Sequence, residues 1–254
     1  MNSHFDNSDH MIPIIIVEGE TISEAWEKSI IELWNKGIIS MKESFYGKSF
    51  EYIKEATTML IVRNPSKEPR VHPWYQADRS FFDRYTKEVI EGYVVNVKVR
   101  KLQKESLDFT DILTRRETFS FKPTYTYYER HRKYRGKIDQ IGYIIKYLRK
   151  TPHTNRAISV TWIPEIDQKN VDVPCNIVIW CKIIEDKLVM ETYWRSRDAW
   201  RGALPNMYAL TELQKMIADE CKVEPGYYID FTSSYHIYEE SFYEVKEALA
   251  TKDK

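Results

Sequence analysis

The sequence predicts an α+β protein in which a mixed or antiparallel twisted sheet packs against long helices. Strand-like apolar runs follow one another without regular strand–helix alternation, and a few long amphipathic segments lie between them. The clearest strand pair is a hairpin over residues 175–196, with its turn at residues 185–187. We expect all 254 residues to form one domain.

The remaining elements are predicted from periodicity and from start and stop residues. Outside the hairpin, strands are predicted over residues 11–19, 58–65, 157–164 and 227–238. Helices are predicted over residues 21–37, 80–93, 137–152 and 206–221. The first helix has Thr21 as N-cap, Glu24 three residues later and Gly37 as its stop, while Gly92 and Pro152 end the next two.

Several segments carry more specific expectations. Helix 137–152 should place one apolar face toward the core, formed by Ile138, Ile141, Ile145 and Leu148. The last helix should be closed by the Glu-Pro-Gly sequence at residues 224–226. Residues 1–10 are expected to be flexible, and the charged, weakly patterned residues 98–122 are expected to be a variable loop or insertion.

Composition excludes several classes of protein. Thirty-eight basic residues balance thirty-eight acidic ones, so we expect no nucleic-acid partner that is held by bulk positive charge. The sequence contains neither a membrane-length apolar run nor a signal-peptide pattern, which predicts a cytoplasmic protein without a membrane partner. Three cysteines do not suit a disulfide framework, and no residues near them have metal-ligand spacing.

Cys175 follows Pro174 at the start of the predicted hairpin and raises two alternatives. Free cysteine is among the most buried residue types, so it could simply fill space in the core. The return strand, however, brings Arg195 and Ser196 close to the start of the hairpin. A guanidinium beside a thiol favours the reactive thiolate, and an adjacent arginine and serine suit an oxyanion or phosphate. A solvated charged strand is the competing interpretation of this segment.

A set of short motifs decides between these alternatives. The chain contains, in order, Arg156, Pro174-Cys175, Arg195-Ser196-Arg197-Asp198, Asn206 and His236-Ile237-Tyr238. Successive motifs are 19, 20, 11 and 30 residues apart, counted from Arg156, Cys175, Arg195, Asn206 and His236. This register resembles the thymidylate synthase family, including members with short C-termini and relatives that are nucleotide hydroxymethylases. The resemblance covers about residues 138–240 and implies that family's fold, a dimer formed through the sheet.

The resemblance also implies a reaction and its catalytic residues. Cys175 would add as a thiolate to C6 of a pyrimidine, and C5 would then take a one-carbon unit from 5,10-methylenetetrahydrofolate. Asn206 would pair with the edge of the base. A helical glutamate of the N-terminal half would remove the C5 proton; we expect Glu91, with Glu88 one turn earlier, and Tyr127 assisting.

The binding residues follow from the same resemblance. Arg195 and Ser196 would hold the 5′-phosphate of a pyrimidine nucleoside monophosphate, together with Arg156 of the partner subunit in a homodimer with a shared phosphate site. His236 and Tyr238 would contact the sugar, and Asp198 would bind the pterin ring of the folate. No metal is implied.

Departures from the family pattern leave the exact reaction open. Asn155 and Trp194 replace an arginine and a glutamine, and the N-terminal phosphate arginine is unrecognisable, although Lys54 could substitute. Only 16 residues follow Tyr238, where family members usually have a closing tail. The leading hypothesis is conversion of dUMP to dTMP. The alternatives are a CMP or dCMP 5-hydroxymethylase, in which water captures the intermediate, and a catalytically silent nucleotide- or RNA-binding relative.

Overall fold

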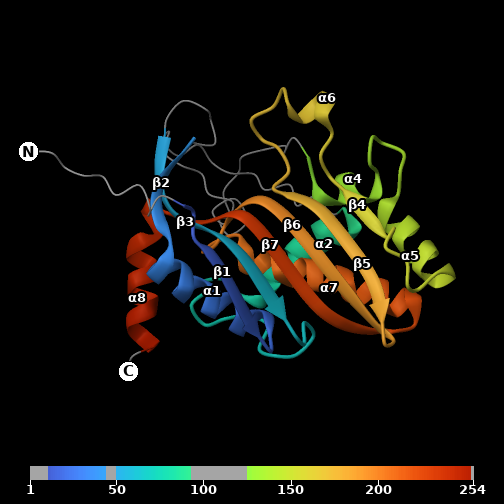
Figure 1. Ribbon diagram of the computed structural model, residues 1–254, viewed down its shortest axis with the longest axis horizontal. Helices are drawn as coiled ribbons and strands as arrows, with labels where there is room; N and C mark the ends of the chain where they lie inside the picture. The colour runs from blue at the N-terminus through green and yellow to red at the C-terminus, as the bar shows by residue number, and fades with distance from the viewer. Residues whose placement is uncertain (1–10, 44–49, 93–124, 253–254) are drawn as a thin grey trace, which may run out of the picture.

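The computed structural model describes residues 11–43, 50–92 and 125–252 (Figure 1). The expectations for residues 1–10 and 98–122 lie outside the described residues. Within the described ranges, one seven-stranded sheet forms the centre of the molecule. No helix in the described ranges is long and apolar enough to cross a membrane.

The sheet combines parallel and antiparallel pairs, which confirms the predicted mixed sheet. Its strands are β1 (Ile14–Gly19), β2 (Ile38–Glu43), β3 (Phe50–Val62), β4 (Ile158–Val160), β5 (Asn176–Ile184), β6 (Lys187–Asp198) and β7 (Glu224–Tyr238). They lie in the order β1-β3-β7-β6-β5-β4, and β2 also pairs with β3. The β1/β3 and β6/β7 pairs are parallel, whereas β3/β7, β5/β6, β4/β5 and β2/β3 are antiparallel.

The predicted hairpin is present as β5 and β6. Its two turn residues, Glu185 and Asp186, both have positive φ, as a tight hairpin turn requires. The register shifts between Asn176 and Val178 at the open end of the hairpin. This irregularity lies directly after Cys175, at the point where β5 begins.

The helices begin and end largely where the sequence predicts. They are α1 (Ile22–Lys36), α2 (Arg79–Glu91), α4 (Tyr127–Arg132), α5 (Gln140–Lys150), α6 (Pro164–Asp167), α7 (Ala203–Cys221) and α8 (Phe242–Lys252). Thr21 caps α1 by accepting a hydrogen bond from the backbone N–H of Glu24. Gly92 ends α2 in the left-handed conformation, with φ of 72°.

Three expectations about the elements were wrong in detail. Ile138 is 52% exposed and precedes α5, because Asp139 caps that helix; Ile144 is buried in the face instead. Residues 224–226 do not close α7 but begin β7, and Lys222 ends the helix with φ of 59°. The strand predicted over residues 157–164 is only the short β4. The sequence analysis also missed β2, α4, α6 and α8.

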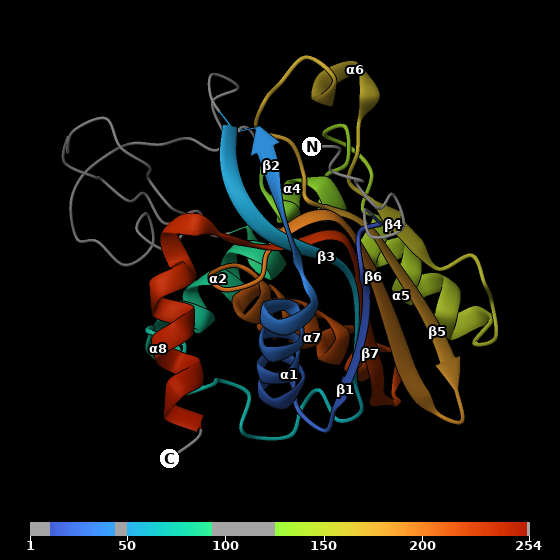
Figure 2. The same cartoon turned by 60° about the vertical axis from the view of Figure 1, so that its left-hand side comes forward.

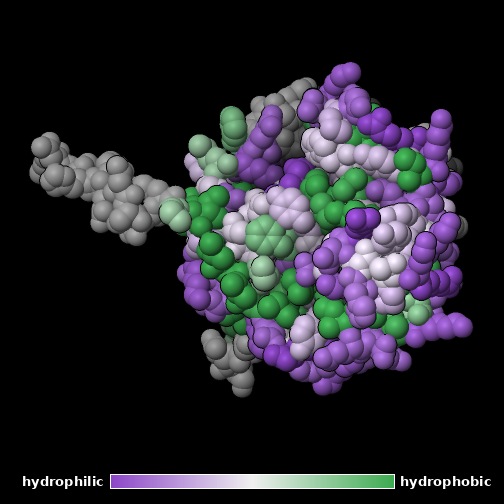
Figure 3. All heavy atoms as spheres, turned by 45° about the vertical axis from the view of Figure 1, so that its right-hand side comes forward, coloured by the Kyte–Doolittle hydropathy of each residue, from purple (hydrophilic) through white to green (hydrophobic). Residues whose placement is uncertain are grey.

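The helices α1, α2 and α7 lie behind the sheet in Figure 1 and bury its inner face. The opposite face of the sheet, called the open sheet face below, carries a row of apolar side chains in register across five strands: Ile16, Met59, Phe231, Tyr193 and Val178. Ile16 is 65% exposed, and the rings of Tyr193 and Phe231 stack with their centroids 5.6 Å apart. Figure 3 shows apolar side chains spread across the middle of the molecule in a view toward this face.

The C-terminal helix α8 lies on the left and β5 on the right in Figures 1 and 2. The helix is held by Trp200, whose indole N–H donates to Glu244, and by Trp74, whose indole N–H donates to the hydroxyl of Thr251.

Candidate active site

Cys175 lies at the mouth of the hairpin, half-buried, with the guanidinium of Arg195 beside its sulfur. One Nη of Arg195 is 3.6 Å from the sulfur of Cys175. The same guanidinium donates to the backbone carbonyls of Pro174 and Val173, at 2.9 and 3.0 Å. The backbone N–H of Arg195 also donates to the carbonyl of Cys175. The arginine is thus fixed in place and brings positive charge to the atom that would be negative in a thiolate.

Tyr127 lies on the other side of the hairpin mouth, at the start of α4. Its hydroxyl accepts a hydrogen bond from the backbone N–H of Asn176, the residue after Cys175. Burial raises the pKa of Tyr127, and negative charge on Cys175 raises it further. The hydroxyl therefore stays protonated at neutral pH, and it is positioned by the backbone of the nucleophile's own segment.

Asn206 lies in the first turn of α7 and is half-buried. Its Oδ1 accepts a hydrogen bond of 2.6 Å from the hydroxyl of Tyr85 on α2. Burial raises the pKa of Tyr85 well above its usual value, with further contributions from negative charge on Tyr127, Glu88 and Cys175. Asn206 is therefore held in place by Tyr85, a residue that the sequence analysis did not identify.

The two glutamates of α2 lie in different environments. Glu91, the expected base, is an exposed side chain in the last position of the helix. Glu88, one turn earlier and three residues after Tyr85, is half-buried. Burial raises the pKa of Glu88 from 4.5 to about 7. Glu88 can therefore exchange a proton near neutral pH beside the other site residues.

His236 and Tyr238 meet Lys42, which the sequence analysis missed. Nδ1 of His236 is 3.0 Å from the carbonyl oxygen of Ser234, to which it must donate, so Nε2 accepts from the ammonium group of Lys42 at 3.2 Å. Lys42 also donates to the hydroxyl of Tyr238. Burial lowers the pKa of His236 to about 3, and positive charge on Lys42 contributes. The imidazole is thus a neutral hydrogen-bonding group.

Lys42, on β2 in the N-terminal part of the chain, brings a positive charge to this site. Burial lowers its pKa, while negative charge on Cys175 and Asp198 acts in the opposite direction. Its partner His236 lies opposite Asp198 in the β6/β7 pair. Within the described ranges, no carboxylate lies within ion-pair distance of it. Lys54, by contrast, lies over the ring of Trp34, with its nitrogen 5.6 Å from the ring centroid.

The other predicted residues have different settings. Ser196 is buried opposite Ser234 on β7. Asp198 shapes the turn before α7, because its Oδ1 accepts from the backbone N–H groups of Trp200 and Arg201. Arg156 is exposed and lies two residues before Ile158, whose side chain is on the open sheet face. Within the described part of the chain, Arg156 has a backbone hydrogen bond to the hydroxyl of Thr154 and no side-chain hydrogen bond or ion pair with the other site residues.

A buried ion pair supports the strand that carries Arg195. The guanidinium of Arg197 donates to both oxygens of Asp230 on β7, at 2.5 and 2.7 Å, and lies over the ring of Trp194. Tyr228 and Thr192 also donate to Asp230. Trp194, which departs from the family pattern, thus contributes to a structural network within β6 and β7.

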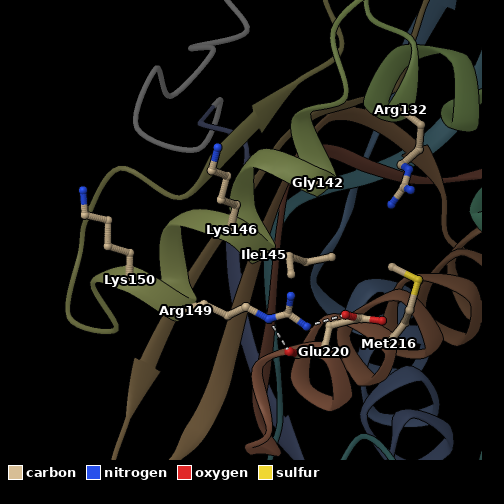
Figure 4. Close-up of a pocket in the computed structure, with 8 residues that line it drawn as sticks. All are labelled: Arg132, Gly142, Ile145, Lys146, Arg149, Lys150, Met216 and Glu220. Atoms are coloured by element: carbon tan, nitrogen blue, oxygen red, sulfur yellow. Dashed lines mark hydrogen bonds and ion pairs between the residues drawn. The ribbon is translucent and has the colours of Figure 1, made fainter.

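A separate hollow between α5 and α7 lies away from these residues (Figure 4). Arg132, Lys146 and Lys150 contribute basic charge to it, but Arg149 is paired with the carboxylate and carbonyl of Glu220. The hollow contains none of the residues that the motifs identify. No group of three or more potential metal ligands occurs in the described part of the chain.

Comparison with known proteins agrees with this geometry. Residues 24–254 match the family described as Thymidylate synthase. The chain is similar to two proteins named "Putative thymidylate synthase", one of Methanosarcina mazei and one of Methanosarcina barkeri. It is 30% identical to the first and 31% identical to the second, and each match covers 88% of this chain and 89% of the relative. It is also similar to the thymidylate synthase of Mycoplasma genitalium, 31% identical over 47% of this chain and 42% of that protein. The chain therefore belongs to the thymidylate synthase family.

Proposed function

We propose that the protein transfers a one-carbon unit to C5 of a pyrimidine nucleoside monophosphate, converting dUMP to dTMP with 5,10-methylenetetrahydrofolate as co-substrate. The observation that carries the proposal is the fixed approach of the Arg195 guanidinium to the sulfur of Cys175, at 3.6 Å. Family membership supplies the reaction class, and the geometry supports Cys175 as the nucleophile.

The proposed chemistry begins with addition of the Cys175 thiolate to C6 of the base. The new S–C6 bond places an electron pair at C5 as an enolate, and C5 then bonds to the methylene carbon of the folate. Loss of the C5 proton breaks the bond between the methylene carbon and the folate nitrogen, which leaves an exocyclic methylene group on C5 and tetrahydrofolate, with C6 still bonded to Cys175. Hydride from the tetrahydrofolate then adds to the methylene group, the S–C6 bond breaks to release the thiolate, and the products are the methylated nucleotide and dihydrofolate.

The C5 proton is assigned to Glu88 rather than to Glu91. A base with a pKa near the working pH is half-deprotonated and can both accept and release a proton. Glu88 has a pKa of about 7 because it is buried, and it lies on the helix that carries Tyr85. Glu91 is exposed at the end of that helix. Tyr127, held against the backbone of Asn176, assists as a hydrogen-bonding group.

The 5′-phosphate is assigned to Arg195 and Ser196, with Lys42 as an additional cation and Arg156 of the partner subunit completing the site. The ammonium group of Lys42 has no ion-pair partner in the described ranges and contacts His236, which lies opposite Asp198 on the neighbouring strand. It therefore supplies the N-terminal positive charge for which the sequence shows no arginine. His236 and Tyr238 are assigned to the sugar, and Asp198 to the pterin ring of the folate.

A homodimer through the open sheet face follows from the same assignment. That face carries the row from Ile16 to Val178 in register across five strands, and its exposure is unusual for a monomer. Arg156 is exposed and lies two residues before Ile158, the first residue of β4. A two-fold axis through this face would let each subunit contribute Arg156 to its partner.

A second candidate is a CMP or dCMP 5-hydroxymethylase, in which water rather than hydride captures the methylene group. The docking of α8 favours it, because Thr251 and Glu244 on this helix are hydrogen-bonded to Trp74 and Trp200 rather than to residues of the candidate site. A site that the C-terminal helix does not close would admit water to the methylene group.

The experiment that tests the proposal measures both the base and the group added. Wild-type protein and a Cys175→Ser variant are incubated with 5,10-methylenetetrahydrofolate and, separately, dUMP, dCMP, UMP or CMP. Mass spectrometry of the nucleotides should show a methyl group on dUMP with the wild type alone. A hydroxymethyl group on a cytidine nucleotide would establish the second candidate, and unmodified nucleotides throughout would reject both.

A further inference from the structure

Tyr85 determines which way the amide of Asn206 faces. Its hydroxyl is buried and lies 2.6 Å from Oδ1 of Asn206. A buried hydroxyl proton requires an acceptor, and an amide oxygen accepts hydrogen bonds but cannot donate them. Burial also raises the pKa of Tyr85, so its proton is retained at neutral pH. The contact therefore turns the oxygen of Asn206 toward α2 and leaves the NH₂ group on the other side.

Asn206 is half-buried, and its NH₂ group has no hydrogen-bond partner in the described parts of the chain. Helix α2, which carries Tyr85, ends at Gly92 against the ring of Tyr128 on α4, and the neighbouring Tyr127 accepts from the backbone N–H of Asn176, the residue after Cys175. In the proposed function, a base joined to Cys175 through C6 pairs with Asn206. A donor in that position pairs with the carbonyl oxygen at C4 of a uracil ring and opposes the amino group at C4 of a cytosine ring.

We propose that Tyr85 is a specificity-determining residue that orients the Asn206 amide so that its NH₂ group selects 4-oxo pyrimidines over 4-amino pyrimidines. This inference rests on the proposed function, since it requires the nucleotide to bind beside Cys175. It goes beyond that function by assigning the choice between uracil and cytosine to a residue on α2 that touches the base only through Asn206. Tyr85 is thus a positioning residue.

The test is a Tyr85→Phe variant, which keeps the ring and its packing and removes the hydroxyl. Dissociation constants for dUMP and dCMP are measured by calorimetry without folate, so that the readout does not depend on turnover. A Tyr208→Phe variant is the matched control: its hydroxyl lies 3.5 Å from Asp83 rather than beside Asn206. Thermal melting of both variants confirms that each is folded.

We expect wild-type protein and Tyr208→Phe to prefer dUMP, and Tyr85→Phe to lose that preference by about 10-fold or more. The reason is that an unconstrained amide can rotate and present its oxygen to the cytosine amino group; one hydrogen bond corresponds to roughly this change. An unchanged dUMP:dCMP ratio in folded Tyr85→Phe would overturn the inference while the proposed function stands. Wild-type protein that binds neither nucleotide would overturn both.

Discussion

The guanidinium of Arg195 lies 3.6 Å from the sulfur of Cys175 and is held there by the carbonyls of Pro174 and Val173. The arginine is anchored to the loop that carries the nucleophile, so the two groups move together. A planar guanidinium can bind two carbonyls and still face the sulfur, whereas an ammonium group cannot reproduce that arrangement.

Arg195→Lys should therefore lower kcat/KM by about 10- to 100-fold, the amount expected for loss of charge-assisted hydrogen bonds. Capture of a 5-fluoropyrimidine nucleotide as a covalent adduct should slow by a similar factor. Mass spectrometry of the intact protein over time measures this rate. Wild-type rates in Arg195→Lys would show that the contact has no role in the addition step.

Glu88→Gln should lower kcat by about 100-fold or more, as expected for loss of a general base. The carboxylate must be deprotonated to accept the C5 proton, so the wild-type rate should rise with pH and level off above about pH 7. This acidic limb should be absent in Glu88→Gln. Glu91→Gln is the control and should retain the wild-type pH profile; the opposite result for the two variants would restore Glu91 as the base.

Lys42→Met should weaken nucleotide binding by about 10- to 100-fold, because it removes one charge-assisted contact to the phosphate. Lys42→Arg should retain most of the affinity, and Lys54→Met should bind normally, since Lys54 lies over Trp34. Calorimetry with dUMP and with deoxyuridine separates the phosphate contribution. Equal losses with both ligands would place Lys42 at the sugar or base instead.

Mixing two inactive variants should restore activity if the phosphate site is shared. Cys175→Ala and Arg156→Ala should each be inactive or weak alone. A heterodimer would contain one intact site, with Cys175 from one subunit and the partner's Arg156, so an equal mixture should recover about a quarter of wild-type activity. Failure to recover activity after subunit exchange, verified by light scattering, would contradict the shared site.

Asp230→Asn should lower the free energy of unfolding by about 3–5 kcal/mol, because it leaves the buried Arg197 guanidinium without its counter-charge. Glu165→Gln removes an exposed pair with Arg135 and should leave stability nearly unchanged. Urea unfolding followed by fluorescence compares the two variants. A small effect of Asp230→Asn would mean that water reaches the pair.

The sequence was sufficient where local chemistry and periodicity agree. The caps of α1, the end of α2 at Gly92, the β5/β6 hairpin and the meeting of Cys175 with Arg195 were all predicted. Strand β2 was missed, although its apolar and polar residues alternate as in a strand. The apolar side chains of Ile39 and Met41 are exposed, while Ser40 and Lys42 are partly buried.

The contacts of Lys42 with His236 and of Tyr85 with Asn206 could not be predicted in this way. They join residues 194 and 121 positions apart, and such pairs depend on how β2 and α2 pack against the rest of the fold. Spacing on a helix also could not distinguish Glu88 from Glu91, because the difference between them is burial. The spacing of the motifs identifies the family, whereas the packing of the folded chain determines how buried each side chain is.

The most direct test of the central claim is mass spectrometry of the nucleotide formed from dUMP and 5,10-methylenetetrahydrofolate by the wild type and by Cys175→Ala. The account predicts a methyl group on dUMP with the wild type and unmodified dUMP with the variant. The same methylated product from Cys175→Ala, at the wild-type rate, would contradict it.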